Sequence, residues 1–381
     1  MENLSQLRVA IVHYWLTGMR GGEKVIEALC EMFPQADIYT HVVRPEALSE
    51  EIRRHAIHTT FIQNLPGSVR HYQHYLPLMP LALEQLDLRG YDLIVSSESG
   101  PAKGGITRTD ALHICYCHSP MRYLWDFYQD YLDSAGFVTR LFMRPFFYSL
   151  RQWDFASAQR VDHVVANSRA VQQRVRRWWG RESVVIHPPV DVERFFSPDM
   201  KRTIPSPPEA GTYYLCLGEL VGYKRVDLAV VACTRSGRQL IVAGDGAERK
   251  RLEAVAGPTV RFVGRVDNGA LPDLYAGCKA FLLPGEEDFG ITPVEAMAAG
   301  RPVVAYGKGG ALDSIVDGKT GMFFERQTAD SLAEALDAFE NRSEPWDSDV
   351  LREHARTFSK HCFQERMARF VTDMLSSKVP V

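Results

Sequence analysis

Short apolar runs alternate with longer stretches of helical spacing along the first half of the chain. The apolar runs are Arg8–His13, Ala36–Thr40, Asp92–Ser96, Leu112–Cys117, His163–Ala166 and Val184–Ile186. Short continuous runs of this kind, bounded by Gly, Pro or polar residues, indicate strands that are buried on both faces. A glycine-rich turn and a helical pattern over 23–32 follow the first run. This alternation predicts βαβ units and parallel sheets, and therefore an α/β fold.

The same rhythm restarts after position 190. Its apolar runs are Tyr213–Leu217, Leu240–Ala243, Val260–Val263, Ala280–Leu283 and Val303–Tyr306, with helical stretches at 225–236, 248–256, 271–278, 293–299 and 328–340. Residues 197–211 are rich in proline and poor in apolar residues, which is typical of a linker. We therefore expect two Rossmann-like domains, over residues 1–195 and 211–360. Helical spacing continues to residue 377, and we expect 361–381 to form a C-terminal helix that packs back on the N-terminal domain.

Charge and cysteine content exclude several classes of protein. The 381 residues carry a net charge of −3, so the chain lacks the basic field of a nucleic-acid binder and we expect no nucleic-acid partner. The seven cysteines are scattered, which favours buried free thiols over a zinc site or disulfides. No apolar run approaches the roughly 18–20 residues that span a bilayer, and the N-terminus lacks the pattern of a signal peptide. We expect a cytoplasmic protein.

Two glutamates follow the apolar run Ala280–Leu283 and are candidates for binding chemistry. Glu287 and Glu295 flank Phe289-Gly290 in the stretch 286–300. In an open parallel sheet, ligands bind where strands end and loops lead into helices. Thr292-Pro293-Val294-Glu295 has the signals of a helix start, with Thr as N-cap and a Thr-x-x-Glu capping box, and free N–H groups there suit a diphosphate. Glu295 could simply cap its own helix, but Glu287, in a loop, has no such structural explanation.

At these residues the sequence resembles glycosyltransferase family 4. The signature is Glu287-x7-Glu295 with Phe289-Gly290 inside it, followed by Gly300-x-Pro302. Other matching motifs occur in order: Gly21-Gly22, His118-Ser-Pro, Asn167-Ser168, Pro188-Pro-Val-Asp191, Gly244-Asp-Gly246 and Gly309-Gly310. The resemblance covers nearly the whole chain. It implies the GT-B fold, with two Rossmann-like domains facing a central cleft, and a retaining hexosyltransferase that uses a nucleotide sugar and needs neither a cofactor nor a metal.

The resemblance also assigns roles to individual residues. Glu287 would accept hydrogen bonds from hydroxyls of the donor sugar and Glu295 from the ribose, because a carboxylate can accept two such bonds. Lys224 would neutralise the diphosphate as it leaves, in place of a metal ion. His118 would lie near the donor sugar, which makes His118, Lys224 and Glu287 the candidate catalytic residues. The other implied donor contacts are Gly21, Gly22, Arg225, Asp288, Phe289, Gly290, Ile291 and Thr292.

One position departs from the family pattern. Glu219 stands where the family usually has an arginine that helps to bind the phosphates. A carboxylate there would repel a diphosphate. Either Arg225 or another base such as Lys308 compensates, or Glu219 turns away from the ligand.

Three stretches of the first half mix aromatic, apolar and basic residues, at 61–83, 140–151 and 174–181. Such patches suit an anionic membrane surface or a lipid-linked acceptor, although core packing with solvated arginines would explain any one of them. We expect membrane contact through the N-terminal domain, which would place the protein on the inner face of the plasma membrane. Arg122 and Asp126 are weaker candidates for contact with the acceptor.

The motifs at 118–126 and 223–227 resemble most those of bacterial O-antigen, lipopolysaccharide and exopolysaccharide mannosyltransferases. This implies GDP-mannose as donor and a glycan or polyprenyl-diphosphate-linked acceptor. The alternatives are a UDP-sugar-dependent transferase of the same fold, an epimerase or phosphorylase, and a nucleotide-sugar-binding protein without catalysis. A dehydrogenase is disfavoured because no G-x-G-x-x-G follows the first strand.

Overall fold

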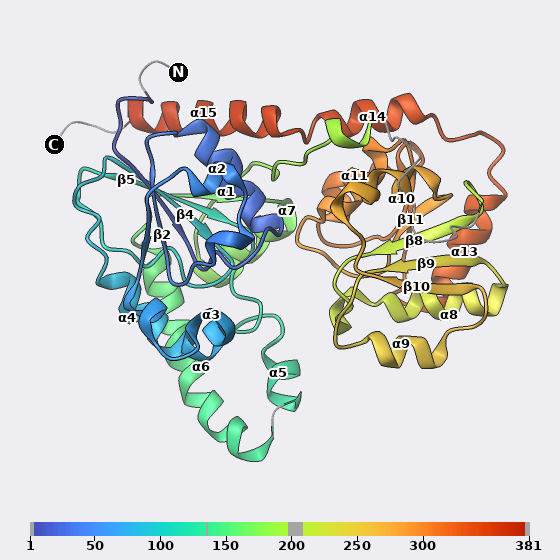
Figure 1. The fold of residues 1–381 in the computed structure, drawn as a ribbon, viewed down its shortest axis with the longest axis horizontal. Coiled ribbons are helices and arrows are strands. Elements are labelled where there is room, and N and C mark those ends of the chain that lie inside the picture. The colour runs from blue at the N-terminus through green and yellow to red at the C-terminus, as the bar shows by residue number, and fades with distance from the viewer. Residues whose placement is uncertain (1–3, 135, 197–208, 378–381) are drawn as a thin grey trace. The chain divides into compact units, whose positions relative to one another are not determined.

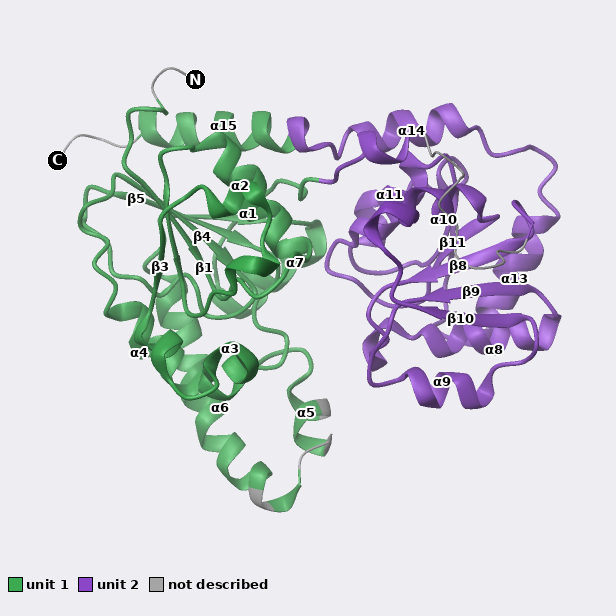
Figure 2. Cartoon of the chain, in the orientation of Figure 1, with its two compact units in different colours: residues 1–189, 363–381 green, residues 190–362 purple. Residues whose placement is uncertain are grey.

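The chain, described by a computed structural model over residues 4–134, 136–196 and 209–377, divides into two compact units (Figures 1 and 2). Unit 1 comprises residues 1–189 and 363–381, and unit 2 comprises residues 190–362. The division lies just before the expected linker, most of which, 197–208, is outside the described residues. Each unit has its own parallel sheet and its own hydrophobic core. The α/β prediction with two Rossmann-like domains is confirmed.

The sheet of unit 1 has seven strands within the described ranges, in the order β3-β2-β1-β4-β5-β6-β7. Their bounds are β1 Val9–His13, β2 Asp37–Thr40, β3 Ile57–Thr59, β4 Leu93–Glu98, β5 Leu112–Cys117, β6 His163–Ala166 and β7 Val184–Val185. All the paired strands run parallel. Every residue of β1, β4 and β5 is buried, as continuous apolar runs predict for central parallel strands.

Unit 1 has eight α-helices among its described residues. They are α1 Gly21–Met32, α2 Glu50–Arg53, α3 Ser68–His71, α4 Met79–Glu84, α5 Tyr128–Ser134, α6 Phe137–Ala158, α7 Arg169–Arg174 and α15 Lys360–Ser377. The C-terminal helical segment is interrupted, because α14 ends at Arg356 before α15 begins. Phe363, Met367 and Val371, spaced by four, bury one face of α15 in the core of unit 1. The C-terminal helix thus lies on the N-terminal unit.

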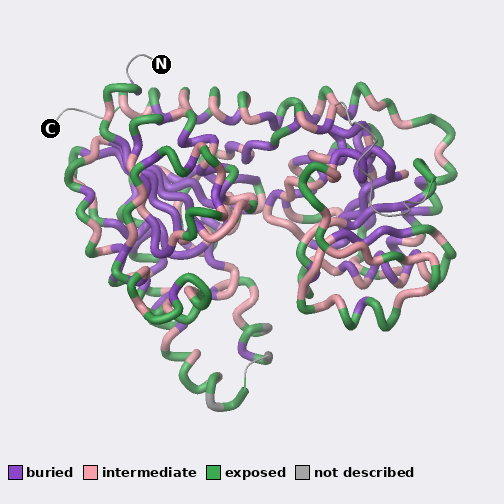
Figure 3. The backbone as a smooth tube through the Cα atoms, viewed as in Figure 1, coloured by how far each residue is buried: buried purple, intermediate pink, exposed green. Residues whose placement is uncertain are grey.

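Helix α6 differs from the other helices because its N-terminal half extends beyond the sheet of unit 1 (Figure 1). Figure 3 shows this half largely exposed, whereas the central strands of both units are buried. Its last turns pack inward, where Ala158 and Asp154 are fully buried.

Unit 2 contains six strands among its described residues, in the order β10-β9-β8-β11-β12-β13. The strands are β8 Tyr213–Leu217, β9 Gln239–Ala243, β10 Val260–Gly264, β11 Ala280–Leu283, β12 Val303–Tyr306 and β13 Gly321–Phe324. The helices are α8 Val226–Ser236, α9 Arg249–Val255, α10 Leu271–Gly277, α11 Ile291–Ala298, α12 Ala311–Ser314, α13 Ala329–Glu340 and α14 Ser348–Arg356. Leu215 and Cys216 belong to different core clusters, so successive residues of β8 point to opposite faces and both faces are buried.

The strand order of each unit reverses direction at one place, between β1 and β4 in unit 1 and between β8 and β11 in unit 2. At such a switch point the connections from the two adjacent strands leave to opposite sides and open a crevice at the carboxyl ends. The loops after these strands carry several of the predicted site residues. All seven cysteines are free, and six of them are buried, which confirms the prediction about thiols.

Candidate functional site

The switch point of unit 2 brings Lys224 and Glu287 together. Lys224 lies in the loop that follows β8, and Glu287 lies in the loop that follows the neighbouring β11. Lys224 Nζ is 3.3 Å from Glu287 Oε1, and the two side chains keep 23% and 18% exposure. A partly buried cation can bind phosphate and a carboxylate can accept hydrogen bonds from hydroxyls, so this edge of the sheet has the chemistry to bind a ligand with both groups.

Close backbone packing holds the Glu287 loop in place. A side chain at Gly285 would bring its Cβ within 2.7 Å of the Lys224 Cα, and one at Gly310 would lie 2.3 Å from the Phe289 Cα. The Gly310 N–H donates to the Glu287 carbonyl at 2.8 Å. These glycines therefore allow three loops to meet at the site, and substitution would force them apart.

Helix α11 begins earlier than the sequence suggested. Its first residue is Ile291, and its N-cap is Gly290 at φ 80°, so the prediction that Thr292 caps the helix is wrong. The reason is that Gly290 takes up the left-handed backbone conformation that turns the chain into the helix. Glu295 then lies beyond the N3 position of a capping box. The N–H groups of the first turn, which include those of Ile291 and Thr292, have no acceptors within the helix.

Glu295 is oriented by a partner that is distant in sequence. Tyr275, on α10, donates its hydroxyl to Glu295 Oε2 at 2.7 Å. Burial, reinforced by the charge of Glu295, raises the pKa of Tyr275 well above its usual value, so the phenol stays protonated and remains a donor. Phe289 is buried and packs against Phe358, whereas Asp288 is partly exposed. The ring of Phe289 thus belongs to the core of unit 2.

The other charged residues around this loop, Arg225, Lys308 and Glu219, differ from Lys224 in their partners and in their exposure. Arg225, at φ 49°, places its guanidinium on Asp227, with Nε 3.0 Å from Oδ1. Lys308 Nζ is 3.3 Å from Glu286 Oε2 and is 60% exposed. Glu219 is exposed, and no described residue forms a hydrogen bond or ion pair with its carboxylate. If Glu219 turns away from the phosphates, its carboxylate must be exposed, as it is here.

The switch point of unit 1 places His118 beside two residues that the sequence did not single out. His13 ends β1, Ser97 lies on β4 in register with it, and His118 directly follows β5. Ser97 Oγ lies 3.1 Å from His13 Nδ1 and 2.8 Å from His118 Nε2. Burial lowers the pKa of His118 to about 4 although part of the residue is exposed, and burial also lowers the pKa of His13 well below its usual value. Both rings are neutral at pH 7.

Gly21 and Gly22 start α1 beside this group. A Cβ on Gly22 would lie 2.7 Å from the Tyr14 hydroxyl and 3.7 Å from His118 Nε2, whereas one on Gly21 would meet nothing within 4 Å. Glu23, in the first turn, accepts a hydrogen bond from the Arg20 N–H at 3.0 Å. A side chain at Gly22 would therefore crowd the Tyr14 hydroxyl, whereas the space beside Gly21 is open.

The basic and aromatic stretch 174–181 is largely engaged within unit 1. Arg174 Nε is 2.9 Å from Asp126 Oδ2, and Arg181 donates to the carbonyls of Ala158 and Asp162. Trp179 is fully buried. For this stretch the core-packing interpretation holds, and the same contacts engage Asp126, which was a candidate for acceptor binding.

Two family profiles match the sequence, one in each half of the chain. Residues 19–194 match the family described as Glycosyltransferase Family 4, and residues 199–358 match Glycosyl transferases group 1. The chain belongs to glycosyltransferase family 4. The glycine turn before α1, His118, Lys224 and the two glutamates all lie inside the matched ranges of this family 4 chain.

Curated relatives of this family 4 chain include transferases of different sugars. A GDP-mannose-dependent alpha-mannosyltransferase of Mycolicibacterium smegmatis is 31% identical over 206 residues, which are 51% of this chain and 52% of the relative. A 2-deoxystreptamine glucosyltransferase of Streptomyces kanamyceticus is 35% identical over 138 residues, or 33% of this chain and 34% of the relative. The match thus spans about half the length of the first relative and a third of the second.

Solved structures of similar fold cover nearly all of the family 4 chain. Anabaena Alr3699/HepE, solved in complex with UDP, aligns with a TM-score of 0.68 and 16% identity over 96% of this chain and all of that one. Sucrose-phosphate synthase from Thermosynechococcus elongatus aligns with a TM-score of 0.69 and 19% identity over 97% of this chain and all of that one. These likenesses show the fold, which is GT-B as predicted.

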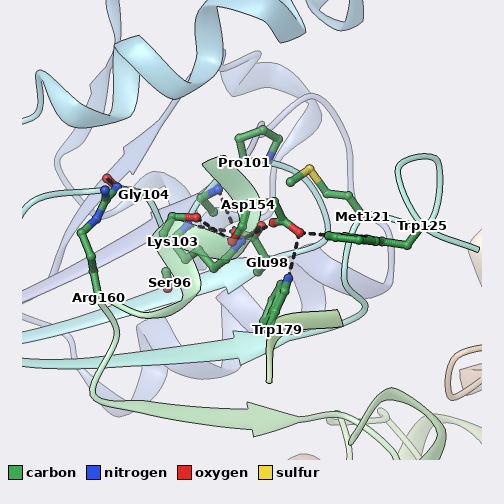
Figure 4. Close-up of polar contacts among 12 residues, drawn as sticks. Ser96, Glu98, Pro101, Lys103, Gly104, Met121, Trp125, Asp154, Arg160 and Trp179 are labelled. Carbon is green, nitrogen blue, oxygen red and sulfur yellow. Dashed lines mark hydrogen bonds and ion pairs between the residues drawn. The ribbon is translucent and has the colours of Figure 1, made fainter. Parts of the chain in front are cut away.

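A buried ion cluster in unit 1, made by Glu98, Lys103 and Asp154, was not predicted. Lys103 Nζ lies 3.1 Å from Glu98 Oε1 and 2.5 Å from Asp154 Oδ1, and all three side chains are fully buried. Figure 4 shows Asp154 between two indole rings: Trp125 and Trp179 each donate to its Oδ2 at 2.8 Å. The Ala102 and Lys103 amides donate to Glu98 Oε2. The cluster ties α6 to the loop that follows Glu98, the residue after Ser97.

Two further properties bear on the predictions. No helix in the described ranges combines the length and the apolar character needed to cross a bilayer. Within the same ranges, no group of three or more His, Cys, Asp and Glu side chains is arranged to hold a metal ion. The predicted independence of metal remains a prediction.

Proposed function

We propose that this chain is a retaining glycosyltransferase that moves mannose from GDP-mannose to a glycan or polyprenyl-diphosphate-linked acceptor in bacterial surface polysaccharide synthesis. The observation that carries the proposal is the Lys224–Glu287 pair, 3.3 Å apart at the switch point of unit 2. Membership of the family supports sugar transfer. Two GDP-mannose-dependent relatives, at 31% and 32% identity, support the choice of donor.

In this proposal Lys224 and the free amides at the start of α11 bind the diphosphate. Negative charge grows on the diphosphate as its bond to the sugar breaks, so a fixed cation there stabilises the transition state more than the ground state. Glu287 holds sugar hydroxyls, and Glu295, oriented by Tyr275, holds the ribose. The acceptor hydroxyl then attacks from the face that the nucleotide diphosphate leaves, and passes its proton to a departing phosphate oxygen. Because Lys224 supplies the charge, the reaction needs no metal and should persist in EDTA.

A panel of nucleotide sugars tests the choice of donor. GDP-mannose is expected to raise the melting temperature and to release GDP in the presence of acceptor, because the site would bind the whole donor. Thermal shift and nucleotide release should be measured with GDP- and UDP-sugars in parallel. Stabilisation by UDP-sugars alone would contradict the mannose donor. Stabilisation without release or transfer with any donor would favour a binding protein without catalysis.

The exposed half of α6 supports the membrane part of the proposal. Phe137, Leu141 and Tyr148 lie on one helical face and are 84%, 62% and 62% exposed, and Phe142 is 70% exposed. Arg144, on the same face, is exposed among them. An apolar stripe with a basic residue suits the interface of a membrane that contains anionic lipids. A lipid-linked acceptor would be presented at such a surface.

Cosedimentation with liposomes tests this surface. The wild-type protein is expected to sediment with anionic vesicles at low salt, and Leu141→Asp/Phe142→Asp is expected to bind at least tenfold more weakly because burying a carboxylate in the interface is costly. Val255→Asp/Val350→Asp is the matched control, since these side chains are also exposed but lie in unit 2. Equal binding by all three proteins, or no sedimentation of the wild type, would contradict docking through α6.

A further inference from the structure

Ser97 lies between two imidazole rings and hydrogen-bonds to both. Its Oγ is 3.1 Å from His13 Nδ1 and 2.8 Å from His118 Nε2. The three residues come from the carboxyl ends of the adjacent strands β1, β4 and β5. Ser97 and His13 are fully buried. The geometry is therefore set by the register of the central strands rather than by a flexible loop.

The number of protons limits how this group can bond. A serine hydroxyl donates one hydrogen bond and accepts others, and a neutral imidazole carries a single N–H. If both rings donated to Ser97 Oγ, the buried Ser97 O–H would have no acceptor among the described residues. Therefore either His13 Nδ1–H donates to Ser97, which then donates to His118 Nε2, or the whole chain runs in the opposite direction. Both rings are neutral at pH 7 because burial lowers the pKa of each.

The far nitrogen of His13 decides between the two directions. His13 Nε2 is buried and has no hydrogen-bond partner among the described residues. If Ser97 donated to His13 Nδ1, the ring proton would lie on Nε2, as a buried N–H without an acceptor. Orphaned N–H groups are rarer in proteins than acceptors left with a free lone pair. The favoured chain is thus His13 Nδ1–H to Ser97 Oγ, and Ser97 Oγ–H to His118 Nε2.

We propose that Ser97 is a positioning residue that fixes His118 in the Nδ1–H tautomer. His118 then offers Nδ1–H as a hydrogen-bond donor to a sugar hydroxyl of the nucleotide-sugar donor. Its Nδ1 is not among the buried side-chain atoms that lack a hydrogen-bond partner, and the residue keeps partial exposure. The role of this hydrogen bond in catalysis rests on the proposed function, whereas the tautomer does not.

Nitrogen NMR of histidine-labelled protein tests the tautomer directly. At pH 7.5, without ligand, the His118 ring is expected to show a protonated Nδ1 and an unprotonated Nε2, with the signal assigned by its loss in His118→Gln. In Ser97→Ala this preference is expected to disappear because Nε2 no longer accepts a hydrogen bond, and Ser97→Thr should restore it. A wild-type His118 protonated at Nε2 would overturn the proposal.

Kinetics test the consequence for the reaction. Ser97→Ala is expected to lower kcat/KM about tenfold, as the loss of one well-placed hydrogen bond does. The matched control is Ser96→Ala, which removes the neighbouring buried serine that bonds His113 Nε2 at 2.9 Å and should leave kcat/KM within about twofold. Equal losses in the two variants would overturn a specific role for Ser97. If His118 shows the expected tautomer but the protein turns over no nucleotide sugar, the proposed function is refuted while the tautomer assignment stands.

Discussion

Lys224→Met is expected to lower kcat for sugar transfer by about 10²–10³-fold while the protein stays folded, because it removes the fixed charge that stabilises the departing diphosphate. Lys224 Nζ is 3.3 Å from Glu287 and the side chain is only partly exposed, so little water replaces its charge in the site. Methionine keeps most of the aliphatic length. The loss should appear in kcat more than in KM, because the charge on the diphosphate grows in the transition state.

Lys308→Met provides a closely matched control for this prediction. Lys308 also lies 3.3 Å from a glutamate, Glu286, but is 60% exposed where Lys224 is 23% exposed. An exposed ion pair contributes little, so kcat of Lys308→Met should remain within about twofold of the wild type. Comparable losses in the two variants would mean that the phosphates contact Lys308 as well. Full activity of Lys224→Met would refute the role of Lys224.

The meeting of Lys224 and Glu287 was predictable because it depends on local features. Each residue follows an apolar run, and the carboxyl ends of parallel strands lie at one edge of the sheet. The partner of Glu295 was not predictable in this way. Tyr275 lies 20 residues earlier, on α10, and reaches Glu295 only through the packing of unit 2. The helix-start pattern favoured Thr292 as the cap because pattern alone does not reveal the backbone conformation of Gly290.

The histidine group of unit 1 shows a second limit. His118 was a candidate through its family motif, but His13 and Ser97 required the register that places β1, β4 and β5 side by side. One signal was available, since His13 also ends an apolar run at the same edge of the sheet. Helix α6 was read only as a mixed patch. The aromatic residues and Pro145 of α6 have low helix propensity, so the local sequence does not predict a helix there. Tertiary contacts at the buried end of α6 outweigh this low propensity.

The burial of Lys103 could not be predicted from the local sequence. It stands in the glycine-rich run 100–105, which suggests a solvated loop. Burial of its side chain depends on Glu98 and on Asp154, which is 51 residues away in sequence. The attraction of both carboxylates raises the pKa of Lys103 despite the opposing effect of burial, so the amine is charged in the folded protein.

Lys103→Met is expected to lower the free energy of unfolding of unit 1 by about 3–5 kcal/mol, because removing one partner leaves buried charge without compensation. Glu98 and Asp154 would keep their amide and indole donors but lose their shared cation. Urea unfolding followed by tryptophan fluorescence measures the change. The signal reports mainly on unit 1, which contains Trp15, Trp125, Trp153, Trp178 and Trp179, whereas unit 2 contains Trp346.

The loss of stability in Lys103→Met can come from uncompensated buried charge or from a packing defect. Its pH dependence and a surface control variant distinguish these two causes. Burial already raises the pKa of Glu98, and loss of Lys103 removes the charge that opposes this rise. When the pKa of an acid is higher in the folded than in the unfolded protein, the folded protein loses stability as the pH rises from the unfolded-state pKa through the folded-state pKa. The loss of stability in Lys103→Met should therefore be larger at pH 8 than at pH 5. Lys24→Met removes a surface pair with Glu27, 2.8 Å apart, and should cost no more than about 1 kcal/mol at either pH. If Lys103→Met lost as little stability as Lys24→Met, the cluster would stabilise unit 1 no more than a surface pair does. A large loss of stability that did not change with pH would instead be assigned to packing around Trp179, whose ring lies 4.3 Å from the Lys103 amine.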